Sequence, residues 1–480
     1  MLFVESRVAD RFVEKDSRLA LLEALAERGH EPLLRASRLH LFEQALAGAE
    51  HARELERLVA EASDAEGEVP YVRGDVFCAE GYSHFVVFGD EEAGGLRAGV
   101  AYGADTPDAA EKLEEFCRAV EGAVRAAARG AGAEGEVDGT AAEAARIEWR
   151  ARGGSAREAL MRFASAGGGD DSPSVSTPRG VTAERLRAGE LLEDEQARTL
   201  LHRLSEAQAD GRLSEMLAPG ARGAGRDELV ARLAGAGLVK REILVSCRRD
   251  GHSLFRLPSS DALAIVTASN AVCSECGTAI ADERAEETVT PTPLADSMLK
   301  DGAWMVNSLR ATLRELGLAG GDVAARPHEE GGARMFANVC GEPFMFVLRD
   351  GDFTGAHARR ALEGEAESHA TRLVVVATGS VQDEARSRLR EHARRRSRAG
   401  AEAEVIFVEG LSNAHAELRR AVERVSQEAL ARELYELDAS AGFSVGRMLA
   451  ARQRLAQRRG ALEDLAASAA GALSGSLREF

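Results

Sequence analysis

Aromatic residues, cysteines and long apolar runs are all scarce in this sequence. Aromatic residues make up 5% of its 480 residues, so the cores must be built mainly from aliphatic side chains. Six cysteines in a chain of this length cannot supply the dense disulfide framework of a small secreted protein. We therefore expect a protein of a reducing compartment and predict a cytoplasmic location.

No membrane segment and no P-loop is predicted. A spanning helix needs about 18 or more consecutive apolar residues, and no stretch of the sequence approaches that length. The apolar positions of residues 1–12 are interrupted by charges, unlike those of a signal peptide. The Gly-x-x-x-x-Gly-Lys-Ser/Thr loop is also missing, which argues against a P-loop ATPase. We expect no membrane partner.

The charge of the chain is strongly acidic, with a formal net charge of −18. A net negative charge repels the phosphates of nucleic acid and argues against a protein that coats DNA or RNA over its whole surface. It leaves room for a local basic surface, and one segment, residues 381–398, concentrates arginine. The candidates for nucleic-acid contacts there are Arg386, Arg390, Arg394, Arg395 and Arg398.

Two interpretations of this arginine-rich segment stay open. Several of its arginines recur at intervals of four residues and would form a stripe on one side of a helix. Such a stripe fits phosphates or an acidic partner. The alternative is an ordinary solvated helix face, because Asp383, Glu384 and Glu391 lie in the same segment and would neutralise part of the charge.

The length and the order of elements predict a multidomain chain of α/β and α+β class. A prior of roughly 150 residues per domain suggests about three domains. Residues 164–180 are rich in Gly, Ser, Pro and Asp, and their lack of core residues indicates a linker. The predicted organisation is an N-terminal α+β module at 1–130, a flexible linker at 131–182, a helical and β-rich segment at 183–290, an α/β domain at 291–440 and a helical tail at 441–480.

Two apolar stretches of the N-terminal module predict a small antiparallel sheet. They cover residues 69–90 and 95–105 and contain short runs of valine, phenylalanine and tyrosine around glycine. We expect a helix to follow, capped by Thr106 with Pro107 at its first position. One side of that helix carries Leu113, Phe116, Val120 and Val124.

The segment at 183–290 combines a helix, a glycine turn and a strand. Residues 227–247 change from a helical pattern to a β-rich one at Gly235 and Gly237. This order is typical of the later part of a winged helix, although many small α+β domains share it. The strand leads to Cys247, the first of three cysteines with metal-like spacing.

The spacing of these cysteines predicts a structural zinc site. Cys273 and Cys276 form a Cys-x-x-Cys turn, and Cys247 precedes them across residues 253–272, which can form a hairpin-like excursion. This is the layout of a zinc ribbon, in which four tetrahedral ligands, chiefly thiolate and imidazole, hold the ion. A site filled in this way has no open position for water, so the zinc would stabilise the fold.

The fourth ligand is ambiguous because the first turn reads Cys-x-x-Asp. His252 would complete a Cys₃His set, which is common in structural zinc sites. Asp250 stands at the position of the missing cysteine and would coordinate through oxygen. We favour His252 on ligand preference, with a metal-free ribbon as the alternative. The predicted zinc ligands are Cys247, His252, Cys273 and Cys276.

The α/β domain at 291–440 follows a regular order of elements. A helix at 297–318 precedes three extended runs, after which helices and strands alternate. The apolar run at 372–379 predicts a central strand covered on both faces. The extended runs lie at 322–326, 334–340 and 344–350, and the later elements at 355–370, 372–379, 381–398, 403–410 and 412–437.

This order resembles the restriction-endonuclease-like fold, also called the PD-(D/E)xK fold, over residues 295–400. The stretch that carries the resemblance is GEPFMFVLRDGDFTGAHARRALEGEAESHATRLVVVATGSV. The resemblance implies two carboxylates that hold Mg²⁺ and a lysine beside them. Val347 matches the second acid, Arg349 the lysine and a position near Asn338 the first acid, so the catalytic motif is degenerate. The nearby carboxylates that would have to replace it are Glu342, Asp350 and Asp352, together with Glu329 and Glu330 before the second extended run.

Together these features predict a non-catalytic binding or scaffolding protein with a structural zinc. The resemblance implies a bacterial nucleic-acid-processing or defence assembly, in which the partner is nucleic acid, another protein or a second copy of the chain. The first alternative is an active Mg²⁺-dependent DNA endonuclease that uses displaced carboxylates. The second is a purely structural subunit without nucleic-acid contact.

Overall fold

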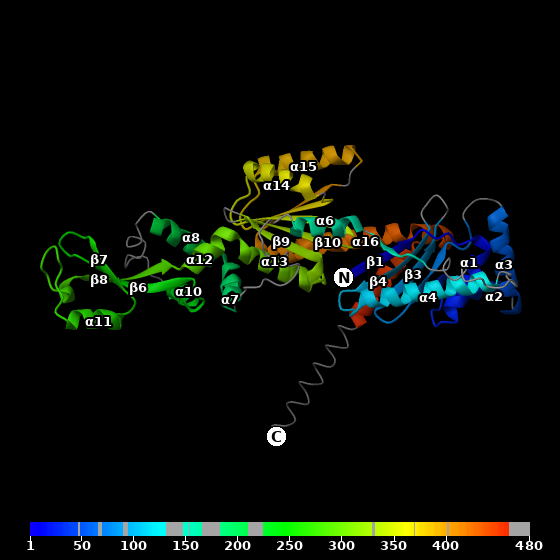
Figure 1. The fold of residues 1–480 in the computed structure, drawn as a ribbon, viewed down its shortest axis with the longest axis horizontal. Coiled ribbons are helices and arrows are strands. Elements are labelled where there is room, and N and C mark those ends of the chain that lie inside the picture. The colour runs from blue at the N-terminus through cyan, green and yellow to red at the C-terminus, as the bar shows by residue number, and fades with distance from the viewer. Residues whose placement is uncertain are drawn as a thin grey trace, which may run out of the picture.

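The described residues form a mixed α/β molecule with three β-sheets. Figure 1 shows an elongated shape, with a three-stranded distal sheet at one end, an N-terminal sheet at the other and a central sheet between them. The coarse prediction of a multidomain α/β chain is confirmed. The computed structural model describes residues 1–46, 49–65, 70–89, 95–130, 147–152, 154–165, 183–209, 224–328, 332–368, 370–400 and 403–459.

The N-terminal sheet is antiparallel and has the strand order β2-β3-β4-β1-β5. Its β2, β3 and β4 confirm the small antiparallel sheet predicted from the sequence. The prediction missed β1, which pairs with β4 along its whole length and places the first residues of the chain inside the sheet. The strands are β1 (Leu2–Ala9), β2 (Gly74–Cys78), β3 (Tyr82–Phe88), β4 (Leu96–Gly103) and β5 (Arg150–Ala151).

Helices cover both faces of the N-terminal sheet. On one face, α4 buries Leu113 and Phe116 in a cluster that it shares with α1, as its apolar side predicted. On the other face lie the end of α16 and the helix at 445–459, which contribute Leu434 and Val445. The helices are α1 (Lys15–Ala26), α2 (Leu33–Leu46), α3 (Ala49–Ala65), α4 (Ala109–Gly130) and α16 (Ala414–Ala441).

The start of α4 differs from the sequence prediction. Thr106 does not cap the helix, because its Oγ1 donates to the carbonyl of Gly81 at 3.0 Å. Asp108 takes the capping position, and its carbonyl accepts the N–H of Lys112 at 3.0 Å. Asp108 has a φ of 57°, a left-handed conformation that Asp tolerates better than most residues. The turn after β4 therefore uses Thr106 to hold β3, and the helix begins later.

The central sheet is mixed, with the strand order β13-β12-β11-β10-β9. β9, β10 and β11 form an antiparallel meander, whereas β11, β12 and β13 are parallel. The predicted order of one helix, three strands and then alternating helices and strands is present from α13 to α16. The strands are β9 (Val323–His328), β10 (Gly332–Val339), β11 (Glu342–Arg349), β12 (Arg372–Ala377) and β13 (Glu404–Glu409).

The central sheet is the middle layer of a three-layer sandwich. On one face, α13 and the first half of α16 pack with Phe344 and Val374. On the other face, α6, α14 and α15 pack with Phe336 and Met345. β12 is buried at all six residues, which confirms the prediction of a strand covered on both faces. The helices are α6 (Gly154–Ser165), α13 (Ala303–Glu315), α14 (Gly355–Ser368) and α15 (Asp383–Arg398).

Part of the segment predicted as a linker belongs to the two large sheets. β5 extends the N-terminal sheet, and α6 packs on β9, β10 and β11 of the central sheet. Leu160 of α6 is 1% exposed, and Phe163 stacks on Phe336 with ring centroids 5.6 Å apart. Residues 131–146 and 166–182 of the predicted linker, and 460–480 of the predicted tail, lie outside the described residues.

The segment at 183–290 is divided between the central core and the distal sheet. Leu201 and Val289 belong to the same buried cluster as Trp304 of α13. The antiparallel distal sheet, with the order β7-β6-β8, projects from this core (Figure 1). The predicted helix, glycine turn and strand are α10, Gly237 and β6. The elements are α7 (Ala183–Leu192), α8 (Glu195–Ala209), α10 (Ala224–Gly235), β6 (Val239–Ser246), β7 (Ser253–Leu257), α11 (Ser260–Ala268), β8 (Arg284–Pro291) and α12 (Pro293–Asp301).

A glycine interrupts the single helix that the sequence predicted at 297–318. α12 ends and α13 begins at Gly302, whose φ of 60° is left-handed. A Cβ atom at this position would lie 2.9 Å from the carbonyl carbon and oxygen of Gly332 on β10. The prediction of one continuous helix is wrong, because Gly302 is both a helix end and a close contact with the sheet.

Replacing Gly302 by alanine is expected to destabilise the protein by roughly 1–3 kcal/mol. The added methyl group would have to occupy a left-handed conformation and would press on the backbone of β10. Urea unfolding of the wild type and of Gly302→Ala measures the loss. Gly320→Ala is the matched control, because nothing lies within 4 Å of its Cβ position; an equal loss there would contradict this explanation.

Candidate metal centre and central-sheet residues

Two turns with the same hydrogen-bond pattern carry the cysteines of the distal sheet. In the first turn, which follows β6, the N–H of Cys247 donates to the carbonyl of His252 at 2.9 Å. The N–H of Gly251 donates to the carbonyl of Cys247 at 2.8 Å. Gly251 has a φ of 73°, and glycine adopts this conformation at little cost. The chain can therefore reverse direction directly after the cysteine.

The second turn, which follows α11, repeats this geometry. The N–H of Cys273 donates to the carbonyl of Thr278 at 2.8 Å, and the N–H of Gly277 donates to the carbonyl of Cys273 at 2.9 Å. Gly277 has a φ of 74°. The two turns therefore share one backbone shape, and Asp250 of the first stands at the position that Cys276 has in the second.

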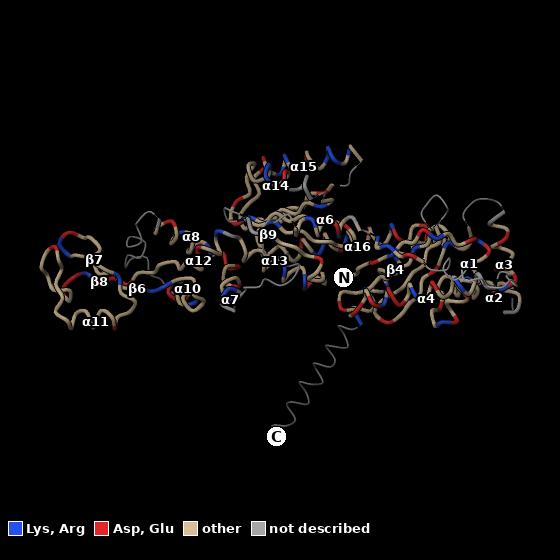
Figure 2. The backbone as a smooth tube through the Cα atoms, viewed as in Figure 1, with Lys and Arg blue, Asp and Glu red and all other residues tan. Residues whose placement is uncertain are grey.

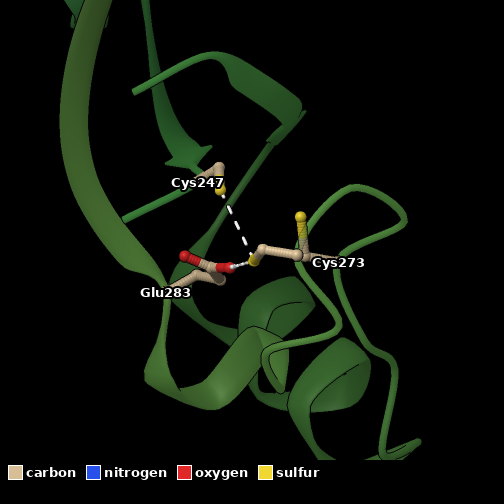
Figure 3. A group of neighbouring side chains, drawn as sticks. Cys247, Cys273 and Glu283 are labelled. Carbon is tan, nitrogen blue, oxygen red and sulfur yellow. Dashed lines mark hydrogen bonds between the residues drawn. The ribbon is translucent and has the colours of Figure 1, made fainter. Parts of the chain in front are cut away.

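The distal sheet brings three cysteines and one carboxylate together. The ligand atoms of Cys247, Cys273, Cys276 and Glu283 all lie within 4.8 Å of one another. Cys276 Sγ lies 3.5 Å from Cys247 Sγ and 3.2 Å from Glu283 Oε1. Figure 3 shows Cys247, Cys273 and Glu283 approaching from separate stretches of the chain. This group can hold a metal ion, as predicted for its three cysteines.

Glu283 reaches the cluster from the position just before β8. The residue is 6% exposed, and its Oε2 accepts the N–H of Arg248 at 2.5 Å. This backbone hydrogen bond lowers the pKa of Glu283 below its usual range. The first cysteine turn therefore orients the carboxylate, because Arg248 directly follows Cys247.

The predicted ligand His252 lies in a neighbouring group. The ligand atoms of His252 and Asp250 are within 4.8 Å of each other and of that of Cys247. His252 is half-buried and Asp250 is exposed. The structure thus brings His252 beside one of the three cysteines, whereas Glu283 shares the space between all three. The identity of the fourth ligand remains a prediction.

Sequence reasoning missed Glu283 because no ligand spacing marks it. The residue follows Cys276 by seven positions, which is not a spacing typical of paired metal ligands. Its place comes from the antiparallel pairing of β6 with β8, which sets Ser246 opposite Arg284. The residue after β6, Cys247, and the residue before β8, Glu283, therefore lie side by side. Strand pairing is the signal that would have identified it.

The hairpin of β10 and β11 fixes the surroundings of Val347, the position matched to a catalytic acid. Val347 is paired with Arg334, and Arg349, two residues further along, lies on the same face. Asn338 is paired with Pro343, four residues from Val347 along β11, a separation of about 13 Å. Asn338 therefore cannot share a metal ion with position 347, and the residue that faces this position is Arg334.

Of the carboxylates considered as replacements, Glu329 and Glu330 lie outside the described residues, and the other three have separate partners. Glu342 Oε1 accepts a hydrogen bond from Arg432 of α16 at 2.8 Å. Asp352 Oδ1 accepts the N–H and the hydroxyl of Ser380 at 2.8 and 2.9 Å. Asp350 contacts α8. Across the part of the chain that the structure describes, none of them belongs to a group of three possible metal ligands.

Asp350 anchors α8 to the end of β11. Its Oδ2 lies 2.9 Å from His202 Nε2, and its Oδ1 accepts the hydroxyl of Thr378 at 2.7 Å and lies 3.7 Å from Arg198 Nε. Burial alone would raise the pKa of Asp350, but the hydrogen bonds from His202 and Thr378 lower it. The hydrogen bond with Asp350 in turn raises the pKa of His202. The ion pair of His202 and Asp350 therefore links α8 to the end of β11.

Part of the predicted arginine stripe on α15 is engaged with β13. Arg386 pairs with Glu409 at 2.7 Å, and Arg386 and Arg390 both lie over the ring of Phe407, 5.0 and 5.4 Å from its centroid. Figure 2 shows basic residues spaced along α15 with acidic ones between them. The exposed members of the stripe are Arg390, Arg394, Arg395 and Arg398.

One Gly-x-Ser-x-Gly spacing occurs, at residues 442–446, and it joins two helices. In α/β-hydrolases this motif forms a turn from a strand to a helix. Here Ser444 Oγ accepts the N–H of Arg447 at 3.4 Å, and the Ser444 carbonyl accepts the N–H of Met448 at 3.1 Å. Ser444 therefore caps the helix at 445–459, and the motif has no nucleophile geometry.

Comparison of the chain with family models, with curated proteins and with solved structures finds no match. The residues described above are therefore the basis for assigning a function. Among the described helices, none combines the length and the apolar character that crossing a membrane requires.

The purified protein is expected to carry about one metal ion per chain, and a Cys273→Ser, Cys276→Ser double variant almost none, because two of the three thiolates are lost. Elemental analysis by mass spectrometry measures the content. Cys78→Ser is the matched control, because Cys78 is an exposed cysteine outside the cluster. Wild-type metal content in the double variant would rule out this site.

Replacing His202 by glutamine is expected to cost less than about 1 kcal/mol of stability at pH 6, and less still at pH 9. The raised pKa of His202 means that its contribution is present below its usual value of 6.5 and is lost as the pH rises through the folded value. Asp350 contributes above its usual value of 3.8. The pair is therefore strongest between about pH 4 and 6.5. Urea unfolding at both pH values checks this, and an equal loss at pH 6 and pH 9 would contradict it.

Proposed function

We propose that this chain is a non-catalytic binding or scaffolding protein of a bacterial nucleic-acid-processing or defence assembly. Its central domain follows the order of elements of the restriction-endonuclease-like fold and would bind nucleic acid without cutting it. The observation that carries this proposal is the pairing of Val347 with Arg334, beside Arg349.

Phosphodiester hydrolysis on such a fold needs carboxylates that hold Mg²⁺ against the scissile phosphate. Val347 stands in place of the second acid and Arg349 in place of the lysine, and Arg334 faces Val347 across the hairpin. A guanidinium group stays charged at all physiological pH values and has no lone pair for a metal. It would repel the cation that the reaction requires. A nuclease-like domain without its acids is suited to binding and assembly.

The metal of the distal sheet is proposed to be a structural zinc ion. Three thiolates favour Zn²⁺ over oxygen-seeking ions such as Mg²⁺. Glu283 is the proposed fourth ligand on geometry, although His252 remains the better ligand type. Four protein ligands leave no position for water, so the ion would hold the two cysteine turns together. The two matched turns and the α10–β6 order support a zinc-ribbon and winged-helix interpretation.

The exposed arginines of α15 are the proposed contact surface for nucleic acid. Contacts with Glu409 and Phe407 hold the side chains of Arg386 and Arg390 in place. These two side chains would therefore lose less conformational entropy when nucleic acid binds. Arg394 and Arg395 extend this surface toward the exposed end of the helix. A local basic surface on an acidic chain confines contacts with phosphates to one place.

The full chain is expected to leave plasmid DNA intact in the presence of Mg²⁺ and to bind DNA with an affinity that falls as salt rises. An Arg394→Glu, Arg395→Glu variant is expected to bind at least roughly tenfold more weakly, because it reverses two charges at the contact surface. Fluorescence anisotropy with a labelled duplex measures binding. Arg419→Glu, Arg420→Glu is the matched control, an adjacent exposed pair on α16.

Other outcomes would select the alternatives. Mg²⁺-dependent cleavage that is lost in Asp350→Asn or Glu342→Gln would identify an endonuclease with displaced carboxylates. Absence of both cleavage and DNA binding, together with a stable protein partner on purification, would identify a structural subunit. Equal weakening by the control variant would mean that the contact surface is not on α15.

A further inference from the structure

The first cysteine turn of the distal sheet carries two further side chains that can bind a metal ion. The ligand atoms of Asp250 and His252 lie within 4.8 Å of each other and of the ligand atom of Cys247. Cys247 also belongs to the group of Cys273, Cys276 and Glu283. Two groups of possible ligands therefore meet at one buried thiol.

The end of the β6–β7 hairpin explains why His252 lies beside Cys247. Ser246 of β6 is paired with Ser253 of β7, so the next residues inward, Cys247 and His252, stand opposite each other. The hydrogen bond from the N–H of Cys247 to the carbonyl of His252, 2.9 Å long, holds them there. Side chains of opposite residues in a hairpin leave from the same face, which brings the thiol and the imidazole together.

The second cysteine turn indicates where Asp250 points. In that turn Cys276 follows Cys273 by three positions, and both side chains reach the same group of ligands. Asp250 follows Cys247 by three positions in a turn with the same backbone hydrogen bonds. The shared shape directs the carboxylate of Asp250 to the side of the turn on which Cys247 lies.

The distances assign the two groups to two ions. Bonds to zinc are about 2.0–2.3 Å long, so the ligand atoms around one tetrahedral ion lie within about 4 Å of one another. The 3.5 Å between Cys247 Sγ and Cys276 Sγ meets this condition for the first group. Asp250 and His252 form their own group with Cys247 and are not members of the first one.

The charges of the ligands are sufficient for two ions. Five of the six ligands in the two groups are anionic when the cysteines are thiolates, and His252 is neutral as a ligand. Two divalent ions would bring four positive charges into this cluster. The anionic ligands, including a thiolate placed between the ions, would offset their mutual repulsion.

We propose that the two cysteine turns bind two divalent ions that share the thiolate of Cys247. The first is the structural zinc of the proposed function, on which this inference rests. The second is held by Cys247, Asp250 and His252, whose sulfur, oxygen and nitrogen atoms suit a borderline ion such as Zn²⁺.

The second ion has different surroundings from the first. Three protein ligands leave a fourth position for water or for an oxygen atom of a bound molecule. Asp250 is exposed and His252 is half-buried, whereas Cys273 and Glu283 of the first group are 2% and 6% exposed. The second ion therefore faces solvent and binds more weakly, so it is expected to fill only when zinc is supplied in excess.

The number of ions is tested on the full chain by dialysis against excess Zn²⁺ and elemental analysis by mass spectrometry. The wild type is expected to hold about two ions per chain, and an Asp250→Asn, His252→Gln variant about one, because only the second site loses its ligands. His415→Gln, which changes an exposed histidine of α16, is the control and is expected to hold two. Circular dichroism on heating checks that the variants are folded.

The other outcomes separate this proposal from that of the structural zinc. One ion in the wild type that is kept by Asp250→Asn, His252→Gln but lost by Cys273→Ser, Cys276→Ser would support the structural zinc alone and overturn the second ion. One ion that both variants lose would make Asp250 or His252 a ligand of the first ion and would also overturn the second. Absence of zinc from the wild type would contradict both proposals.

The sharing of Cys247 is tested by electron paramagnetic resonance of the chain loaded with Co²⁺ in place of Zn²⁺. Ions that share a ligand in two-metal sites lie about 3.5–4 Å apart, and two paramagnetic Co²⁺ ions joined by a thiolate couple magnetically. The signal per bound ion is expected to fall as the second ion binds to the wild type. It is expected to stay constant in Asp250→Asn, His252→Gln, which binds one ion. A wild-type signal that grows in proportion to two bound ions would overturn the shared thiolate.

Discussion

α16 holds the two large sheets in one arrangement because its two halves are buried in different cores. Leu418 and Val425 pack in the core of the central sheet, whereas Leu434 and Leu437 pack on the N-terminal sheet. A rotation of one sheet against the other would have to break the helix or expose one of these two sets of apolar side chains, at about 1.5–3 kcal/mol for each side chain. The strand ends of the central sheet therefore keep a fixed position relative to the N-terminal module.

Local patterns were sufficient for much of the fold. The apolar run of β12 and the one-sided pattern of Leu113 and Phe116 on α4 depend only on neighbouring residues, and both predictions are confirmed. β1 was missed because Glu5 and Arg7 interrupt its apolar positions, and only its pairing with β4 makes it a strand. The break at Gly302 was missed for a similar reason, since it reflects a contact with β10 across the sheet.

The same distinction between local patterns and long-range contacts applies to the candidate sites. The cysteine turns could be predicted because each is a local reversal that needs a cysteine and a glycine at fixed spacing. Glu283 joins them only through the register of β6 and β8. On the central sheet, the partner of Val347 depends on the hairpin register, which sequence alone did not give. The residue that faces Val347 is therefore the cationic Arg334, and not the neutral Asn338 that was matched to the first acid.

The distal sheet has two ends that depend on different forces. Val239 begins β6 inside the central core, and Cys247 follows the far end of the same strand. Apolar packing therefore secures the base, while the tip would be held by bonds to the proposed metal ion between the two cysteine turns. Chelation, or oxidation of the thiols, would loosen the tip and leave the base folded, a case of local opening without global unfolding. The availability of metal and the redox state of the surroundings would thus determine whether the tip of the distal sheet is ordered, while the rest of the protein stays folded.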